Sequence, residues 1–453
     1  MSTEPGRDRL NLSTKVLYLF GDVGISMCVS AIAFFLLFFY TDVAHIDPAL
    51  MGTILLLCKI WDAINDPLFG WISDRTKSRF GRRKIYMLLG AIPFGVSFAL
   101  LWTMPGKFTG VVLAGMIALL FFLYYSFDTV VAVPYYAMTP ELTRDYDERT
   151  SLSAIRMIGG TIGYMAGAVL PPLIAGLFIT EKIGWSMMGI MFGAFAILCL
   201  YVTALGVKRR KDLEGSPSKL PPVKSILLCF KNRPFNFLLI QGAITGTSFQ
   251  LVMSYMAYYL TYQLNMKNQI SLLMALLLGT ILLFLIFWKW MANKWNKGPV
   301  YALGLFIAFG ATAASFLLPF GGSSWIYLIV FIAGFGFSAQ YVLPWSILPD
   351  VVEYDELITG ERREGMYYGV RGFIGKLSDA MGLFIAGWVL KIFHFVPNAV
   401  QTSESLLGIR LFFGPVPSFL VLCSLPFLIW FPINRKKHFE MVGMINSKRN
   451  LGA

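Results

Sequence analysis

The chain has 453 residues, of which 57% are hydrophobic and only 14% are charged, and its formal net charge is +13. Soluble domains carry roughly a quarter charged residues, so this composition excludes an ordinary soluble protein and indicates a polytopic membrane protein. The positive charge requires no nucleic-acid partner, because basic loops beside anionic lipid headgroups account for it.

Apolar runs long enough to cross a bilayer core of about 30 Å recur along the whole chain. They lack the alternation of a β-barrel, so only helices can satisfy the backbone in lipid. We therefore predict an all-α polytopic membrane protein with twelve transmembrane helices in two groups of six. The predicted spans are 14–42, 47–72, 85–104, 109–139, 151–178 and 184–207, then 236–263, 268–290, 299–319, 324–350, 366–391 and 408–432.

The loops predict the orientation. Basic residues are concentrated in the N-terminal tail, the loops after even-numbered spans and the C-terminus, whereas the other side carries only Lys107, Lys182, Lys267 and Lys391. The positive-inside rule then places both termini in the cytoplasm and the protein in the plasma (inner) membrane. The first residues contain no short apolar segment followed by a cleavage site, so the first span is expected to be retained.

The two groups of helices predict an N-terminal half (1–207), a basic cytoplasmic linker (208–235) and a C-terminal half with a short tail (236–453). The linker segment "VKSILLCF" could form a short interfacial helix. Span four ends "VPYYAMTPELTRDYDERTSLSAIR" and span ten ends "LPWSILPDVVEYDELITGERREGMYYGVR", so both carry Pro-aromatic, Pro-acid and an acid-Tyr-Asp-Glu tetrad. This weak repeat favours duplication, and two parallel six-helix repeats are the architecture of the major facilitator superfamily.

Charged side chains inside the predicted spans are the candidate site residues, because each costs about 2.5–3.5 kcal/mol in mid-span. On span one, Asp22 could line a cavity or pair with a basic residue elsewhere. On span two, helical periodicity places Lys59, Asp62 and Asp66 within about 60° of one another, with Asn65 about 60° to the side. Two carboxylates and an amide oxygen suit Na⁺, or a shared proton with one raised pKa. Alternatively, Lys59 simply neutralises Asp62, which leaves Asp66 unexplained.

The loop after span two, "GWISDRTKSRFGRRK", contains Asp74 and Arg75 at a helix end and Arg82 beyond Gly81. It resembles the Gly-x-x-x-Asp-Arg…Gly-Arg-Arg signature of major facilitators, with a wider spacing before the glycine. The resemblance implies that the acid docks on a neighbouring helix terminus and steadies one conformation of a transporter.

On span four, Thr129, Ala132 and Tyr136 share one face of the helix. The Thr129 hydroxyl could complete a cation site contributed by span two, or could simply bond to its own helix. Asp128 points about 100° away from Thr129 and could face the cavity or pair with Arg156 of span five.

On span eleven, Arg371 and Lys376 lie about 140° apart, so they are not expected to point into the same cavity. Lys376 could pair locally with Asp379, or face the cavity and couple with the acidic cluster on span two. The residues leave both possibilities open.

The segments "KIWDAINDPLFGW", "VPYYAMTP" and "EGMYYGVRGFIGK" resemble those of the glycoside–pentoside–hexuronide:cation symporters, the melibiose-permease branch of the major facilitators. This resemblance implies a coupling ion, Na⁺, Li⁺ or H⁺, bound at Asp62, Asn65, Asp66 and Thr129. It also matches the family's span-five arginine and span-eleven lysine to Arg156 and Lys376.

The resemblance weakens at the sugar site. Two aspartates that hold galactosyl hydroxyls in melibiose permeases correspond to Ser26 and Ala132, and a stacking tryptophan corresponds to Tyr136. The segments "YVLPWSILPDVV", "AINDPLFGW" and "DVAHIDP" are also similar to the vertebrate sodium-dependent lysophosphatidylcholine symporters, which carry an amphipathic lipid.

The sequence thus predicts a monomeric, cation-coupled (Na⁺ or H⁺) symporter of a small glycoside-like solute, working by alternating access and holding no cofactor. Its expected partners are that solute, a monovalent cation bound at Asp62 and Asp66, and membrane lipids. The alternatives are a sodium-coupled lysophospholipid symporter and an uncoupled lipid scramblase or facilitator. The sequence carries no His-Glu-x-x-His, nucleophile elbow or phosphate-binding loop, which argues against an enzyme. No loop is long enough to favour a receptor or scaffold.

Overall fold

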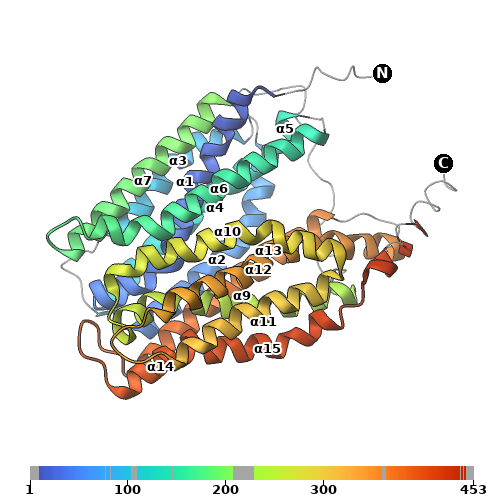
Figure 1. Cartoon of the computed structure of the whole chain (residues 1–453). Helices are drawn as coiled ribbons and strands as arrows, with labels where there is room; N and C mark the ends of the chain where they lie inside the picture. The colour runs from blue at the N-terminus through green and yellow to red at the C-terminus, as the bar shows by residue number, and fades with distance from the viewer. Residues whose placement is uncertain are drawn as a thin grey trace. The chain divides into compact units, whose positions relative to one another are not determined.

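The computed structural model describes residues 10–76, 78–81, 83–103, 110–143, 146–207, 229–359, 364–438, 440–441 and 443–444. Within these residues, twelve helices are long and apolar enough to cross a membrane, which confirms the predicted fold class (Figure 1). The chain divides into two compact units, Met1–Lys219 and Leu220–Ala453. Most of the segment "VKSILLCF" lies outside the described residues, so its interfacial helix stays a prediction.

The first unit is built from six long helices and one short one. Helix α1 packs along α6 and α7, α3 packs against α4 and α7, and α2 packs against α4. Their bounds are α1 (Leu12–Phe38), continued by a π-helical turn η1 (Phe39–Val43), then α2 (Pro48–Arg75), α3 (Lys84–Leu101), α4 (Gly110–Ala137), α5 (Thr139–Leu142), α6 (Tyr146–Ala175) and α7 (Glu181–Gly206).

Glycines allow α6 to approach α1 closely. Gly159, Gly163 and Gly167 recur every four residues and therefore share one side of α6. A Cβ at Gly163 would lie 2.2 Å from the carbonyl oxygen of Val23, and one at Gly167 would lie 2.2 Å from that of Met27. Small residues at such spacing allow two membrane helices to pack backbone to backbone. This contact fixes the polar side chains of α1 and α6 close to one another.

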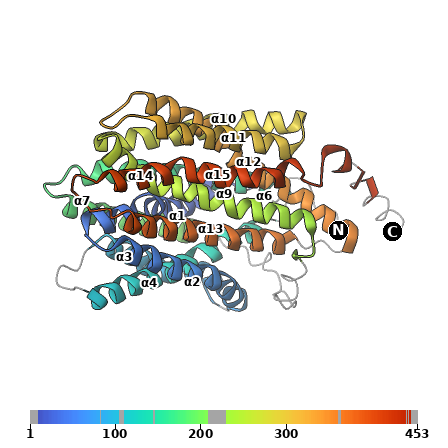
Figure 2. The same cartoon turned by 90° about the horizontal axis from the view of Figure 1, so that it is seen from below.

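The second unit repeats this packing scheme. Helix α9 packs on α13 and α15, α11 packs on α12 and α15, and α10 packs on α12 (Figure 2). The elements are α9 (Arg233–Tyr258), η3 (Tyr259–Gln263), η4 (Lys267–Gln269), α10 (Ile270–Lys294), α11 (Lys297–Ala314), η5 (Ser315–Leu317), α12 (Trp325–Thr359), α13 (Glu364–Ile392), α14 (Ser403–Phe413) and α15 (Pro415–Ile429).

The first helix of each unit also ends in the same way. Both α1 and α9 run into a five-residue π-helical turn, η1 or η3. Each turn is followed by a residue with positive φ, His45 at 56° and Asn265 at 53°. Residues other than glycine rarely adopt a positive φ. The occurrence of such residues at matching positions of the two units supports an internal duplication.

The predicted last span, 408–432, is instead two helices that meet at Gly414. Pro415 has no N–H to donate and disfavours a helical conformation in the residue before it, so the helix is interrupted there. A Cβ at Gly414 would lie 2.4 Å from the carbonyl oxygen of Thr312, which shows how closely α11 approaches this break. Helix α12 also continues to Thr359, beyond the predicted end at residue 350.

Candidate cation and solute sites

The acidic pair of α2 faces α4 at Thr129. The Thr129 hydroxyl lies 3.0 Å from Asp66 Oδ1 and 3.4 Å from Asp62 Oδ1. Asp62 and Thr129 are buried and Asp66 is half-buried. A hydroxyl has a single proton, so it can donate to one of these carboxylates at a time. The structure therefore brings together three of the four residues predicted for the cation site.

Lys59 also belongs to this cluster. Its ammonium lies 2.9 Å from Asp62 Oδ2 and 4.5 Å from the centre of the Tyr125 ring. The local pairing of Lys59 with Asp62, one of the two interpretations of the sequence, is therefore present. Lys59, Asp62 and Asp66 together bring two carboxylates and one ammonium into a protein interior, where charged groups require compensation.

Asn65, the fourth predicted residue, is fully buried on the same helix. Neither the oxygen nor the nitrogen of its amide has a hydrogen-bond partner among the described residues. A buried polar group without a partner costs about 1–3 kcal/mol. An amide oxygen is a hard ligand of the kind that small cations take, so a bound cation would compensate for the cost of burying the oxygen.

A second polar cluster joins α1, α4 and α6. Asp22 Oδ1 accepts hydrogen bonds from Ser26 and from Tyr136, each at 3.2 Å. Asp22 Oδ2 lies 3.7 Å from the guanidinium of Arg156, which in turn stands 4.8 Å over the Tyr136 ring. Of the two alternatives for Asp22, the structure shows pairing with a basic residue. Arg156 therefore pairs with Asp22.

The surroundings hold this second cluster in place. The Tyr135 hydroxyl donates to the carbonyl of Tyr18 at 2.7 Å, and Tyr18 donates back to the carbonyl of Tyr135 at 3.0 Å, which fastens α4 to α1. Asp22 is buried, whereas Tyr136 is 42% exposed and the Arg156 side chain 26%. A solute would therefore reach the cluster from the side of Tyr136 and Arg156.

The remaining candidate residues lie on α4, on α13 and in the gating loop. Ala132 is buried on α4 between Thr129 and Tyr136, and Asp128 is also buried. Lys376 is half-buried on α13 of the second unit, and its choice between Asp379 and the acidic cluster stays open. In the gating loop, Arg75 is exposed at the end of α2. The side chain of Asp74 and the whole of Arg82 lie outside the described residues, so the gating role stays a prediction.

The sequence reading missed an ionic cluster in the second unit. The Lys297 ammonium lies 2.7 Å from Asp350, and His438 Nε2 lies 2.8 Å from Glu353. The first contact joins α11 to α12, and the second joins the segment after α15 to α12. The acidic tetrads of the sequence lie at helix ends: Glu353 opens the second tetrad, and Glu148, which closes the first, forms an ion pair with Lys15 at 2.8 Å.

Comparison with known proteins places the chain in a family. The family model for MFS/sugar transport proteins matches residues 17–435. The chain is 31% identical to an uncharacterized symporter (sll1374) of Synechocystis, over 99% of both chains. It is 28% identical to a putative sulfoquinovose importer of Escherichia coli, over 98% of this chain and 95% of the relative. It is 25% identical to the sodium-dependent lysophosphatidylcholine symporter 1-B of Danio rerio, over 98% of this chain and 91% of the relative.

Solved structures agree on the fold. A bacterial homologue of the human drug peptide transporters PepT1 and PepT2 superposes with a TM-score of 0.66 at 15% identity, covering 93% of this chain and 98% of the other. A bacterial homologue of the human lysosomal transporter Spinster gives a TM-score of 0.61 at 15% identity, covering 98% and 99%. Both structural similarities show the fold alone.

Proposed function

The chain belongs to the MFS/sugar transport protein family and is an integral membrane transporter of the symporter kind. From that premise we propose that it couples the movement of a small glycoside-like solute to that of Na⁺ or H⁺. The observation that carries this proposal is the Thr129 hydroxyl shared between the carboxylates of Asp62 and Asp66. Two acids gathered around one hydroxyl inside a membrane unit are explained by a cation that they bind.

The solute site is the cluster of Asp22, Ser26, Tyr136 and Arg156. A carboxylate and a guanidinium side by side offer an acceptor and several donors, which suits a molecule with many hydroxyl groups. The partly exposed ring of Tyr136 provides a flat surface against which a sugar ring can pack. A polar cluster of this kind favours a glycoside over a lysophospholipid, although a lysophosphatidylcholine symporter is among the relatives.

Helix α4 connects the two sites. Thr129 contacts the acidic pair and Tyr136 contacts Asp22, and the two residues are seven positions apart, about two helical turns. A shift of α4 that tightens one set of contacts therefore changes the other. Cation and solute affinities are then linked, each ligand raising the affinity for the other by the same factor.

The transport mechanism in this proposal is alternating access, with the two six-helix halves exposing the sites to one side of the membrane at a time. The protein works as a monomer in the plasma membrane, with both termini in the cytoplasm. The loop of Asp74, Arg75 and Arg82 steadies one of the two conformations.

Uptake into proteoliposomes tests the proposal. Purified protein is reconstituted, and uptake of a panel of radiolabelled glycosides and lysophosphatidylcholine is measured with an inward Na⁺ gradient, an inward H⁺ gradient, or neither. We expect a glycoside to accumulate only with one of the gradients. Gradient-independent equilibration of any substrate would refute coupling and indicate a facilitator or scramblase, and gradient-driven uptake of lysophosphatidylcholine alone would move the substrate class to lipids.

A further inference from the structure

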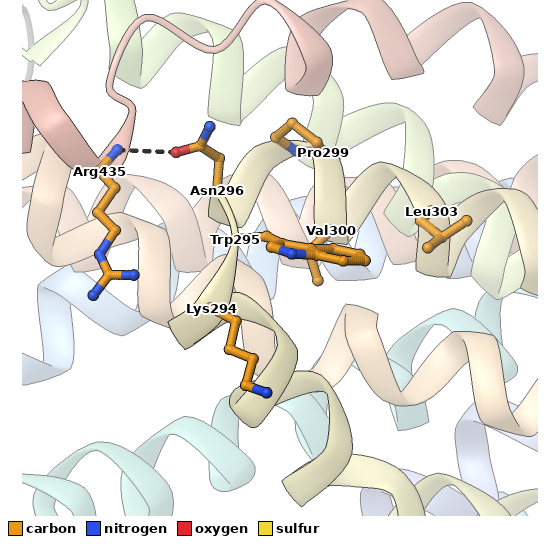
Figure 3. A pocket seen from close by; sticks show the side chains of 7 residues that line it. All are labelled: Lys294, Trp295, Asn296, Pro299, Val300, Leu303 and Arg435. Carbon is orange, nitrogen blue, oxygen red and sulfur yellow. Dashed lines mark hydrogen bonds between the residues drawn. The ribbon is translucent and has the colours of Figure 1, made fainter.

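A pocket of about 490 Å³ lies where α10 ends and α11 begins. It is lined by Lys294 at the last position of α10, Trp295 and Asn296 in the connection, and Leu303 on α11, together with Arg435 from the segment after α15. Figure 3 shows Arg435, Asn296 and Lys294 at one end of the pocket and Leu303 at the other. All of these residues belong to the second unit. The pocket therefore spans the boundary between the end of a membrane helix and the loop beyond it.

The polar end of the pocket is positively charged. Lys294 and Arg435 both line it, and none of its described lining residues is acidic. The Arg435 backbone N–H donates to Asn296 Oδ1 at 3.1 Å, and its Nη1 donates to the carbonyl of Asn293 at 2.9 Å. The Lys294 ammonium stands 4.3 Å from the centre of the Trp290 ring. Each basic side chain thus contacts a neighbouring residue, and basic groups at a pocket attract an anion.

The other end of the pocket is apolar and open to the surroundings. Leu303 is 40% exposed, and Phe306, one turn further along α11, is 57% exposed. Trp290 and Trp295 are also more than half exposed beside the two cations. Tryptophans at the ends of membrane helices mark the level of the lipid headgroups. A ligand that fills the pocket needs an anionic head and an apolar tail; a free anion would use only one end.

We propose that this pocket is a binding site for an anionic phospholipid of the surrounding bilayer. The phosphate lies between the Lys294 ammonium and the Arg435 guanidinium, and an acyl chain runs along the exposed side chains of Leu303 and Phe306. The site lies on the basic side of the second unit, which we predict to be cytoplasmic, where anionic lipids attract basic pockets between membrane helices. The inference does not rest on the proposed solute or cation site.

Native mass spectrometry of the detergent-purified full-length protein tests this inference. Dioleoyl phosphatidylglycerol is titrated into the sample, with dioleoyl phosphatidylcholine in a parallel series. The double variant Lys294→Ala/Arg435→Ala is compared with the double variant Lys289→Ala/Lys436→Ala, which loses the same charge at exposed positions outside the pocket. We expect the first variant to bind phosphatidylglycerol about 25-fold more weakly, since each of the two basic groups near an anionic lipid contributes roughly fivefold. The control variant should bind it like the wild type.

Equal losses in the two double variants would overturn the site, because binding would then follow net charge alone. So would equal binding of phosphatidylcholine and phosphatidylglycerol by the wild type. Displacement of the lipid by millimolar inorganic phosphate would overturn the acyl-chain part and leave a simple anion site. Lys294→Glu serves as a second variant in case loss of the Arg435 hydrogen bonds disturbs the fold. Thermal melting of every variant checks that it is folded.

Discussion

Replacing Asp66 by asparagine tests the cation site most directly. The substitution keeps the size of the side chain and an oxygen that can accept from Thr129, but it removes one of the two negative charges beside Lys59. The variant should fold at least as well as the wild type when no cation is present, because it removes repulsion between two carboxylates that share one hydroxyl. The loss should therefore appear in cation binding and coupling only.

Coulomb's law gives the size of the effect. A cation held about 4 Å from a carboxylate gains about 4 kcal/mol at an effective dielectric constant of about 20. The amide oxygen retains part of this as a neutral ligand, so we expect a net loss of about 3 kcal/mol, which is roughly a hundredfold weaker binding of the cation. Cation-driven uptake at ordinary concentrations would then be abolished.

Thermal melting in detergent measures the binding step without transport. A ligand at a hundred times its dissociation constant stabilises the folded state by about 2.7 kcal/mol, so the coupling cation should raise the melting temperature of the wild type but not of Asp66→Asn. Asp47→Asn is the matched control, because Asp47 lies just before α2 and accepts the N–H of Leu50, at 2.9 Å, as a helix cap. Asparagine caps equally well. An unchanged cation-induced shift, or unchanged coupled uptake, in Asp66→Asn would refute the site.

Three further predictions concern the first unit. Thr129→Val should raise the half-saturating cation concentration about tenfold or more, since a hydrogen bond to a charged group contributes about 1.5–3 kcal/mol, whereas Thr129→Ser should transport like the wild type. Arg156→Gln should abolish glycoside uptake while leaving the cation-induced rise in melting temperature intact. Gly163→Val should lower the melting temperature sharply, because a Cβ there would meet the Val23 carbonyl at 2.2 Å, whereas Gly115→Ala, with open space, should be neutral or stabilising.

Each of these predictions has an outcome that contradicts it. Equal cation dependence in the valine and serine variants of Thr129 would mean that the hydroxyl is not a ligand. Loss of the cation-induced shift in Arg156→Gln would mean that the two clusters are a single site. A melting temperature for Gly163→Val as high as that of the wild type would mean that α6 does not pack on α1 through its glycines.

The cluster of Lys59, Asp62 and Asp66 could be predicted from the sequence because all three residues belong to one helix. Lys59, Asp62 and Asp66 follow one another at intervals of about one turn, so periodicity alone puts them on one face. The structure adds the contact of Lys59 with Asp62 and the contact of Thr129 with the acidic pair. The partner of Asp22 could not be predicted in this way. Arg156 lies on α6 and contacts Asp22 on α1. This contact depends on the close approach of the two helices at Gly159 and Gly163, which no local sequence pattern specifies.

Tertiary contacts also account for the structural features that the sequence did not predict. A continuous apolar run predicted a single last helix, although Pro415 interrupts it at Gly414. The contact of His438 with Glu353 joins a tail to a helix end about eighty residues away in sequence, and the lipid pocket likewise depends on Arg435 reaching the connection between α10 and α11. Hydropathy identifies membrane spans; it carries no information on which loops meet.

The two units share a packing scheme but differ in the charges of their second long helices. This difference bears on where cation coupling takes place. Helix α10 occupies in the second unit the place that α2 occupies in the first, since each packs on the fourth span of its own half. Yet the only charged residues of α10 are Lys289 and Lys294, both near its end, whereas α2 carries Lys59, Asp62 and Asp66 in its middle. The two units thus share a packing scheme but differ in the charged side chains of their interiors. Packing requires neither acid, because α10 packs without them, and this supports the proposal that the acids of α2 bind a cation.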